Sequence, residues 1–278
     1  MPALHRVAHR GYSAVAPENT LPALAAAVLA GATFVEFDVR TSADGVPVVI
    51  HDRTVDRTTD GTGHVWELTC AEIGALDAGS WFSPAYAGLS IPLLSDVLDL
   101  LAPHAAGPDD SPAALHSDFR RGPAPAPAQA AGVVPNLAGP VELLLEIKPP
   151  ATTDQVAAIL AQVDNRGLLG RTVVQSFDPD VVRRVGEVAP EVRRGLLRHG
   201  FDAEQVAIAK DLGLDYCNPS LVAVLDDPGT VAELRENGVR VMPWTANDPQ
   251  QWPALVDAGV AGLITDHAGT LTGWTNLA

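Results

Sequence analysis

Two acids and a histidine stand within apolar, strand-like sequence near the amino terminus. Glu36 and Asp38 interrupt the run Phe34-Val-Glu-Phe-Asp-Val39, and His51 ends the run Val46-Pro-Val-Val-Ile50. Acidic side chains are rarely buried unless they are paired or bind a metal. Residues two apart on a strand project to the same side, so Glu36 and Asp38 share a face. These residues therefore either lie on a solvated face or converge on a charged partner.

A third acid, Glu146, has the same kind of position in the later run Glu142–Lys148. Three carboxylates that share one site repel one another unless a cation lies among them. Oxygen-only ligation is the preference of hard cations, so we predict one divalent ion, Mg²⁺ or Ca²⁺, with Mn²⁺ or Co²⁺ as further candidates. The alternative is a buried network of ion pairs between one or two of these acids and Arg10, Arg40 or Lys148.

His9 and His51 are the predicted proton carriers, because histidine titrates near neutral pH. A lone histidine at a strand end would be interpreted as a structural residue. Two histidines beside three acids and an arginine favour general acid–base catalysis instead. The remaining histidines have no comparable company and are interpreted as structural or surface groups: His5, His64, His104, His116, His199 and His267.

Arg10 and Lys148 supply fixed positive charge where a phosphate could bind. The planar guanidinium of arginine suits two phosphate oxygens, and lysine acts as a point charge. The alternative role is charge balance against the carboxylates. Trp244 offers a flat wall, either for packing or for the carbon skeleton of a substrate. Glu18 and Asn19 are close enough to the end of the first strand to support the site from behind.

The elements that must position these residues read as repeated βα units, because short β-branched runs alternate with Ala-, Leu- and Val-rich stretches. The strand candidates are residues 6–9, 34–38, 46–51, 142–148, 172–176, 193–198, 215–218, 239–245 and 262–265. The helix candidates lie near residues 20–30, 95–102, 153–165, 179–188, 203–212, 228–237 and 249–258. This α/β pattern predicts a TIM (β/α)₈ barrel, in which the carboxyl ends of the strands form the active site.

Nine strand candidates exceed the eight that such a barrel needs. Only the connection between Asp38 and Val46 is too short for a crossover helix, and it contains Asp44-Gly45, a strong hairpin signal. The run 46–51 is therefore predicted to fold back as an antiparallel arm. With Asp44 and Gly45 as the two central turn residues, Asp38 is expected to face His51.

The whole chain of 278 residues is predicted to form a single TIM-barrel domain. Residues 53–92 are interpreted as a small inserted cap that follows the hairpin arm. Residues 103–140 are rich in proline and alanine and are interpreted as a low-complexity loop before the third barrel strand.

A net charge of −16, from 34 acidic and 18 basic residues, argues against nucleic-acid binding and against docking on anionic membranes. An anionic small-molecule substrate would need a local cation to overcome this field. The chain shows neither an apolar signal region nor an apolar run of about 18 residues, so we expect a soluble, cytoplasmic protein without stable membrane association.

Many spaced motifs together resemble the glycerophosphodiester phosphodiesterase family over nearly the whole chain, apart from about residues 103–140. The matching motifs are His9-Arg10-Gly11, Pro17-Glu-Asn-Thr20, Glu36-Phe-Asp38-Val, Asp44-Gly45, His51-Asp52, Arg57-Thr-Thr-Asp-Gly-Thr-Gly63, Leu76-Asp-Ala-Gly79, Trp81-Phe82, Ile91-Pro92, Glu146-Ile-Lys148, Ser176-Phe177, Trp244-Thr-Ala-Asn247 and Gly262-Leu-Ile-Thr-Asp266.

The resemblance implies a TIM barrel with a small insertion that hydrolyses glycerophosphodiesters to glycerol 3-phosphate and an alcohol with a divalent metal. Carried over, the metal ligands are Glu36, Asp38 and Glu146, and the acid–base pair is His9 and His51. Arg10 and Lys148 would contact phosphate, and Trp244 would pack near the glycerol moiety. A lysophospholipase D or phospholipase C-like enzyme acting on lipids is the alternative, and a non-enzymatic phosphate-ester binding protein is a third interpretation.

Overall fold

The computed structural model describes residues 4–105 and 140–277. Most of the predicted loop at 103–140 therefore lies outside the described residues, although the helix before it continues to Ala105.

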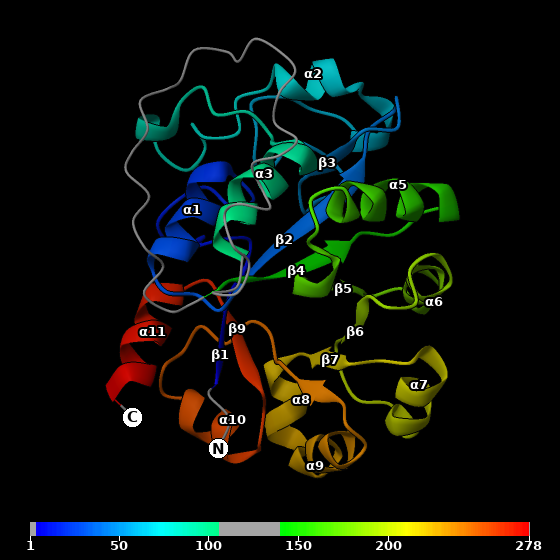
Figure 1. The fold of residues 1–278 in the computed structure, drawn as a ribbon. Helices are drawn as coiled ribbons and strands as arrows, with labels where there is room; N and C mark the ends of the chain where they lie inside the picture. Colours follow the sequence, from blue (N-terminus) through cyan, green and yellow to red (C-terminus); the bar gives the residue numbers. More distant parts are fainter. Residues whose placement is uncertain (1–3, 106–139, 278) are drawn as a thin grey trace.

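A ring of parallel strands forms the centre of the molecule, and helices surround it (Figure 1). The hydrogen-bonded order of the strands is β8-β7-β6-β5-β4-β2-β1-β9, and β3 pairs with β2 outside this path. The strands of the described residues are β1 (His5–Ala8), β2 (Phe34–Thr41), β3 (Pro47–Val49), β4 (Glu142–Ile147), β5 (Thr172–Ser176), β6 (Arg193–Arg198), β7 (Tyr216–Pro219), β8 (Arg240–Val241) and β9 (Gly262–Thr265).

Three backbone hydrogen bonds connect the two end strands of this order. Ala261 N donates to Val241 O (2.7 Å), Ile264 N to Pro243 O (3.0 Å), and Ala246 N to Ile264 O (2.8 Å). They bring the segment around β8 against β9, so that eight parallel strands enclose a barrel. The predicted TIM barrel is thereby confirmed.

The helices lie around the barrel and bury their apolar faces against the strands. They are α1 (Leu21–Leu29), α2 (Cys70–Gly74), α3 (Leu94–Ala105), α5 (Thr153–Asp164), α6 (Pro179–Val188), α7 (Gln205–Leu212), α8 (Leu221–Asp226), α9 (Pro228–Glu236), α10 (Trp252–Asp257) and α11 (Ala268–Leu277). In the described residues, none is both long enough and apolar enough to span a bilayer. The sequence did not predict α2, α8 or α11, although α8 and α11 each follow a strand that it did predict.

The inner face of the barrel is closed at one end by a layer of apolar side chains. Nearly every barrel strand or its extension contributes one member: Val7, Phe34, Leu144, Val173, Tyr216, Met242 and Ile264. All of them are buried. This layer forms the floor on which polar residues further along the same strands can be held.

The antiparallel arm is present, but its predicted register is wrong by one residue. Arg40 pairs with Val48 and Thr41 with Pro47, so the extrapolated partner of Asp38 is Ile50 rather than His51. The turn holds three residues, 43–45, because Ser42 N donates to Val46 O (3.0 Å) and the Ser42 hydroxyl accepts from Val46 N (3.0 Å). Gly45 has a φ of +81°, which glycine adopts without strain and which completes a three-residue hairpin loop.

Residues 53–92 pack as a small layer over the arm. Besides α2, this segment contains two short 3₁₀-helices, Val65–Glu67 and Pro84–Tyr86. Its apolar side chains join Val48 and Ile50 of the arm in one buried cluster with Val55, Val65, Ile73, Ala78 and Ile91. Asp77 fixes the segment from within, since its carboxylate accepts hydrogen bonds of 2.7–2.8 Å from three backbone amides and the Ser80 hydroxyl.

Candidate active site

On several strands, a polar residue of the site lies two positions beyond a residue of the apolar floor. Glu36 lies two residues beyond Phe34, and Glu146 lies two beyond Leu144. Strand side chains alternate between faces, so an inward floor residue fixes the inward direction two and four positions later. His9 and Trp244 stand in the same relation to Val7 and Met242, although each lies just past its strand. The barrel thus directs these side chains into one cavity of about 410 Å³ at the carboxyl ends of the strands.

The three predicted metal ligands converge. Oxygen atoms of Glu36, Asp38 and Glu146 lie within 4.8 Å of one another, and the residues are only 1%, 1% and 4% exposed. The pairing of β2 with β4 explains their proximity, because Asp38 is the register partner of Glu146. In the described residues this is the one group of acidic, cysteine or histidine side chains that could hold a metal ion.

Basic groups offset part of this buried negative charge. The Lys148 ammonium lies 2.9 Å from Asp38 Oδ1 and 2.6 Å from Glu146 Oε1. The Arg10 guanidinium approaches Asp38 at 3.5 Å, and the Arg10 backbone N–H donates to Glu36 Oε2 (2.8 Å). The ion-pair network considered from the sequence therefore exists for Lys148 and Arg10. Arg40 takes no part in it, since its guanidinium donates to the carbonyls of His51 and Pro149.

The charge balance of the cluster fits a divalent cation. Burial favours the protonated form of Asp38, but Lys148 and Arg10 outweigh this effect and lower its pKa. Burial and the neighbouring carboxylates raise the pKa of Glu36 and of Glu146. Two of the three acids are thus undercompensated by the protein's own cations. Buried oxygen ligands with uncompensated charge are a suitable donor set for Mg²⁺ or Ca²⁺.

His9 is held by a carboxylate from the far end of the chain. Its Nδ1 lies 2.7 Å from Asp266 Oδ1. Asp266 directly follows β9, and the pairing of β9 with β1 brings the two residues together. Burial would raise the pKa of Asp266, but hydrogen bonds from His9, Asn247 and Ser13 lower it to about 2. An ionised carboxylate only accepts hydrogen bonds, so the proton is on Nδ1 and neutral His9 has Nε2 available as an acceptor.

His51 is held in the same way by its neighbour. Its Nδ1 lies 2.6 Å from Asp52 Oδ1, and Arg57 donates to both Asp52 oxygens at 2.7 and 3.1 Å. Burial is the main cause that lowers the pKa of His51, which favours the neutral ring. Arg57 also donates to Glu18, and Glu18 accepts from Arg10 at 2.8 Å. Hydrogen bonds between charged groups therefore connect His51, through Asp52, Arg57 and Glu18, to the guanidinium of Arg10.

Asn19 supports the acid cluster from a strained turn before α1. Its φ is +57°, and its side chain donates to Asp38 Oδ2 (2.7 Å) and accepts from Asp38 N (3.2 Å). Arg10 likewise has a positive φ of +55°. Gly11 follows it at +79°, where a Cβ would lie only 2.5 Å from the Ala23 carbonyl carbon. The His9-Arg10-Gly11 turn therefore requires glycine at its third position.

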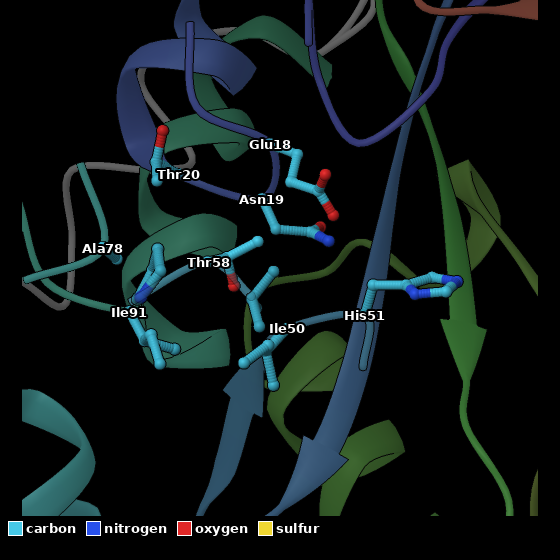
Figure 2. Close-up of a pocket in the computed structure, with 10 residues that line it drawn as sticks. Glu18, Asn19, Thr20, Ile50, His51, Thr58, Ala78 and Ile91 are labelled. Carbon is cyan, nitrogen blue, oxygen red and sulfur yellow. The ribbon is translucent and has the colours of Figure 1, made fainter. Parts of the chain in front are cut away.

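A second, much smaller cavity lies behind His51. Figure 2 shows Asn19, Ile50, Thr58 and Ile91 around it, with the imidazole of His51 turned away from this group. Its volume of about 10 Å³ suits no more than a single water molecule. This cavity lies between the loop before α1, the arm and the inserted segment, and it is too small to bind a substrate.

Aromatic rings form one wall of the large cavity. Trp244 lies edge-on to Phe177 and His199 at centroid distances of 5.4 Å, and its indole N–H donates to Asn218 O (2.9 Å). His199 stacks on Phe177 at 5.0 Å. His199, interpreted from the sequence as a structural or surface group, is exposed, and it also lines the cavity because β6 ends beside this wall.

All the predicted site residues lie in or directly behind one cavity. Sequence reasoning from residue type missed the carboxylates that anchor the histidines, Asp52 and Asp266, and the bridging Arg57. All three appeared only within the quoted motifs. The signal for the two acids was a carboxylate directly after a strand-like run and next to a histidine in the sequence. The buried Gln175, which accepts from Asn218 Nδ2 (2.7 Å), gave no such signal.

A parallel barrel with ionisable residues gathered at the carboxyl ends of its strands defines an enzyme of the TIM-barrel class. Residues 9–109 and 140–270 match the model of the glycerophosphoryl diester phosphodiesterase family. A glycerophosphodiester phosphodiesterase from Caldanaerobacter subterraneus subsp. tengcongensis is 31% identical over 265 residues, which are 95% of each chain. One from Bacillus subtilis is 29% identical over 281 residues, covering 94% of this chain and 83% of the relative.

Solved structures agree in fold. A glycerophosphodiester phosphodiesterase from Agrobacterium tumefaciens has a TM-score of 0.75 at 26% identity, covering 97% of this chain and 99% of that one. An Oleispira antarctica phosphodiesterase in complex with sn-glycerol-3-phosphate has a TM-score of 0.80 at 24% identity, covering 100% and 98%. The chain belongs to the glycerophosphoryl diester phosphodiesterase family, and it is a phosphodiester hydrolase. These relatives do not favour the alternative of a lysophospholipase D or phospholipase C-like enzyme that acts on lipids. The interpretation as a non-enzymatic phosphate-ester binding protein is wrong.

Proposed function

We propose that the protein hydrolyses glycerophosphodiesters to glycerol 3-phosphate and an alcohol, with a divalent cation at Glu36, Asp38 and Glu146. The observation that carries this proposal is the pair of histidines, each anchored through Nδ1 to a carboxylate, in one cavity with three buried acids. Two proton carriers beside a cation site are what the cleavage of a phosphodiester requires.

His9 and His51 divide the proton transfers between them. One Nε2 removes the proton of the attacking hydroxyl, and the other ring, which enters the step protonated on Nε2 as an imidazolium, gives that proton to the oxygen of the leaving alcohol. Asp266 and Asp52 fix the tautomer of each ring and stabilise the imidazolium that forms during turnover. The acid cluster would hold the cation, which would supply Lewis-acid stabilisation of the charge on the phosphate.

Arg10 and Lys148 offset the charge that builds on the phosphate oxygens. Both already contact the acid cluster, so their charges are fixed at its edge and need little reorganisation. Trp244, together with Phe177, offers an apolar wall for the glycerol carbons. Glu18 and Asn19 act by positioning, because they hold Arg10 and Asp38 rather than line the reaction path.

The test is release of glycerol 3-phosphate from metal-stripped protein given glycerophosphocholine or glycerophosphoethanolamine. Mg²⁺, Ca²⁺, Mn²⁺ and Co²⁺ are added back separately. We expect release that depends on at least one ion, and the rank of the ions identifies the preferred cofactor. A folded, metal-loaded protein that releases no glycerol 3-phosphate from either substrate would refute the proposal.

A further inference from the structure

Two arginines line the large cavity without a carboxylate partner in the part of the chain that the structure describes. The other basic side chains of the site are all paired: Arg10 with Glu18, Arg57 with Glu18 and Asp52, and Lys148 with Asp38 and Glu146. Arg40 and Arg53 lie on the same cavity but make no such ion pair. This exception is notable in a protein with 34 acidic residues and a net charge of −16.

The contacts of Arg40 orient its guanidinium without neutralising it. Its Nε donates to His51 O (2.9 Å) and its Nη1 to Pro149 O (3.4 Å), and both acceptors are uncharged carbonyls. The exposed Arg53 uses only its backbone carbonyl, which accepts from Val65 N (3.0 Å), and its side chain has no hydrogen bond among the described residues. Among the described residues, both guanidinium groups therefore lie at the cavity without a carboxylate in contact, although Asp38, Glu146 and Asp52 act on Arg40 from beyond ion-pair distance.

Both arginines lie nearer to solvent than the acid cluster and the two histidines of the proposed reaction. Arg40 lies two residues beyond the buried Asp38 on the same face of β2 and is partly exposed. Arg53 lies two residues beyond His51 and is exposed. A phosphodiester held at the acid cluster, Arg10 and Lys148 would extend its leaving alcohol from the buried end of the cavity toward this pair.

We propose that Arg40 and Arg53 form an anion subsite for a negatively charged group on the leaving alcohol. This inference rests on the proposed function and narrows its substrate class to diesters whose alcohol carries a carboxylate or a phosphate ester. Guanidinium groups bind such groups through paired, charge-assisted hydrogen bonds. The same two charges disfavour an alcohol that carries a quaternary ammonium.

The test compares four substrates that differ only in the leaving alcohol: glycerophosphoglycerol, its terminal phosphate ester, glycerophosphoserine and glycerophosphocholine. Wild type is expected to give the highest kcat/KM with the phosphate ester and the lowest with glycerophosphocholine. In Arg53→Gln, the ratio of kcat/KM for the phosphate ester to that for glycerophosphoglycerol should fall about tenfold, the scale of one charge-assisted hydrogen bond. Arg53→Lys should retain part of the ratio, and the serine ester distinguishes a carboxylate from a phosphate.

Arg183→Gln is the matched control, since it removes the same charge from an exposed arginine on α6 that pairs with Asp211 outside the cavity. Its substrate ratio should equal that of wild type. An unchanged ratio in Arg53→Gln, or an equal fall in Arg183→Gln, would overturn the subsite. Calorimetric binding of the phosphate ester to metal-stripped wild type and Arg53→Gln gives a readout without turnover. Loss of hydrolysis of every substrate, with Arg53-dependent binding retained, would overturn the proposed function alone.

Discussion

At the scale of single residues, the site contains two pairs in which a carboxylate fixes a histidine that we propose as a proton carrier. Asp266 holds His9, and Asp52 holds His51. Each pair leaves Nε2 available while it sets the tautomer, so both rings can exchange protons at that atom. The acid cluster differs, because its three carboxylates contact only two basic side chains, Arg10 and Lys148.

His9→Ala and His51→Ala are each expected to lower kcat by at least about 10²-fold, because each removes a proton carrier. Asp266→Asn keeps the His9 ring but loses its ionised acceptor, so its kcat should lie between that of His9→Ala and wild type. Steady-state kinetics on glycerophosphoethanolamine measure all three. Near-normal kcat in both alanine variants would remove the assignment.

The acid cluster predicts an unusual dependence of stability on pH in metal-free protein. The pKa values of Glu36 and Glu146 are raised, so their contribution to stability is greatest below the usual glutamate value of 4.5 and is lost as pH rises through the raised pKa. We expect the Tm of stripped protein to fall between about pH 5 and about pH 8, with a smaller fall when a divalent cation is bound.

Glu36→Gln is the control for this effect. It removes one of the two carboxyls with raised pKa, so the fall in Tm with pH should be shallower in stripped Glu36→Gln than in stripped wild type. The added cation should also raise the Tm of this variant less. Equal slopes in both stripped proteins would contradict the assignment of the pH dependence to the acid cluster.

At the scale of elements, turns position the site as much as strands do. The Asn19 turn places a buried amide against Asp38, and the Gly45 turn sets the register that brings the arm back beside β2. The hydrogen bonds of Asp77 fix the segment that packs on the other side of the arm. The Gly45 turn and the segment held by Asp77 therefore help to position His51, and the Asn19 turn positions Asp38.

Asn19→Gly and Asn19→Ala separate the two functions of that residue. Both lose the hydrogen bonds to Asp38, but only alanine also bears the cost of the left-handed conformation, about 1–2 kcal/mol. Urea unfolding should therefore rank wild type above Asn19→Gly, and Asn19→Gly above Asn19→Ala. An alanine variant as stable as the glycine variant would show that the backbone conformation costs nothing here.

Asp77→Ala is expected to lower the Tm, because four hydrogen bonds to one carboxylate are lost. These bonds lower the pKa of Asp77, so its contribution is present above the usual aspartate value of 3.8 and declines as pH falls below it. The difference in Tm from wild type should thus be larger at pH 7 than at pH 3. Asp226→Ala, an exposed aspartate at the end of α8, is the matched control.

The extent to which sequence predicts structure differs between these elements. Most barrel strands were found to within one residue, because apolar runs mark them locally, but β2 continues three residues beyond the predicted 34–38 and β8 covers only Arg240–Val241 of the predicted 239–245. The arm was found but misregistered, because a three-residue loop and a two-residue turn share the same Asp-Gly signal and only the Ser42 hydrogen bonds decide between them. Asp266 was missed as the partner of His9, and Arg57 as a partner of Glu18, because each contact joins segments far apart in the sequence.

At the scale of the whole molecule, the inserted segment and the barrel share one apolar cluster. Val48 and Ile50 belong to the arm, and they pack with residues from across the segment 53–92. The Asp44 carboxylate in the arm's turn also accepts from Cys70 N at the start of α2 (2.9 Å). These contacts support the prediction of a single domain in which the cap depends on the barrel.

Calorimetry tests this prediction directly. We expect one unfolding transition in which the calorimetric and van't Hoff enthalpies agree, because the segment has little apolar core without the arm. Two separate transitions, with the first removed by substitutions at Ile73 or Ala78, would instead define the segment as an independent unit.

The pairing of His9 with Asp266 also has a consequence for how activity arises during synthesis. The two residues are 257 positions apart, and β1 lies beside β9 in the barrel. A ribosome must therefore add 257 further residues after His9 before this histidine can meet its carboxylate. Any product of premature termination before Asp266 lacks that partner, so a partly made chain cannot hold His9 in the orientation that the proposed proton transfer needs.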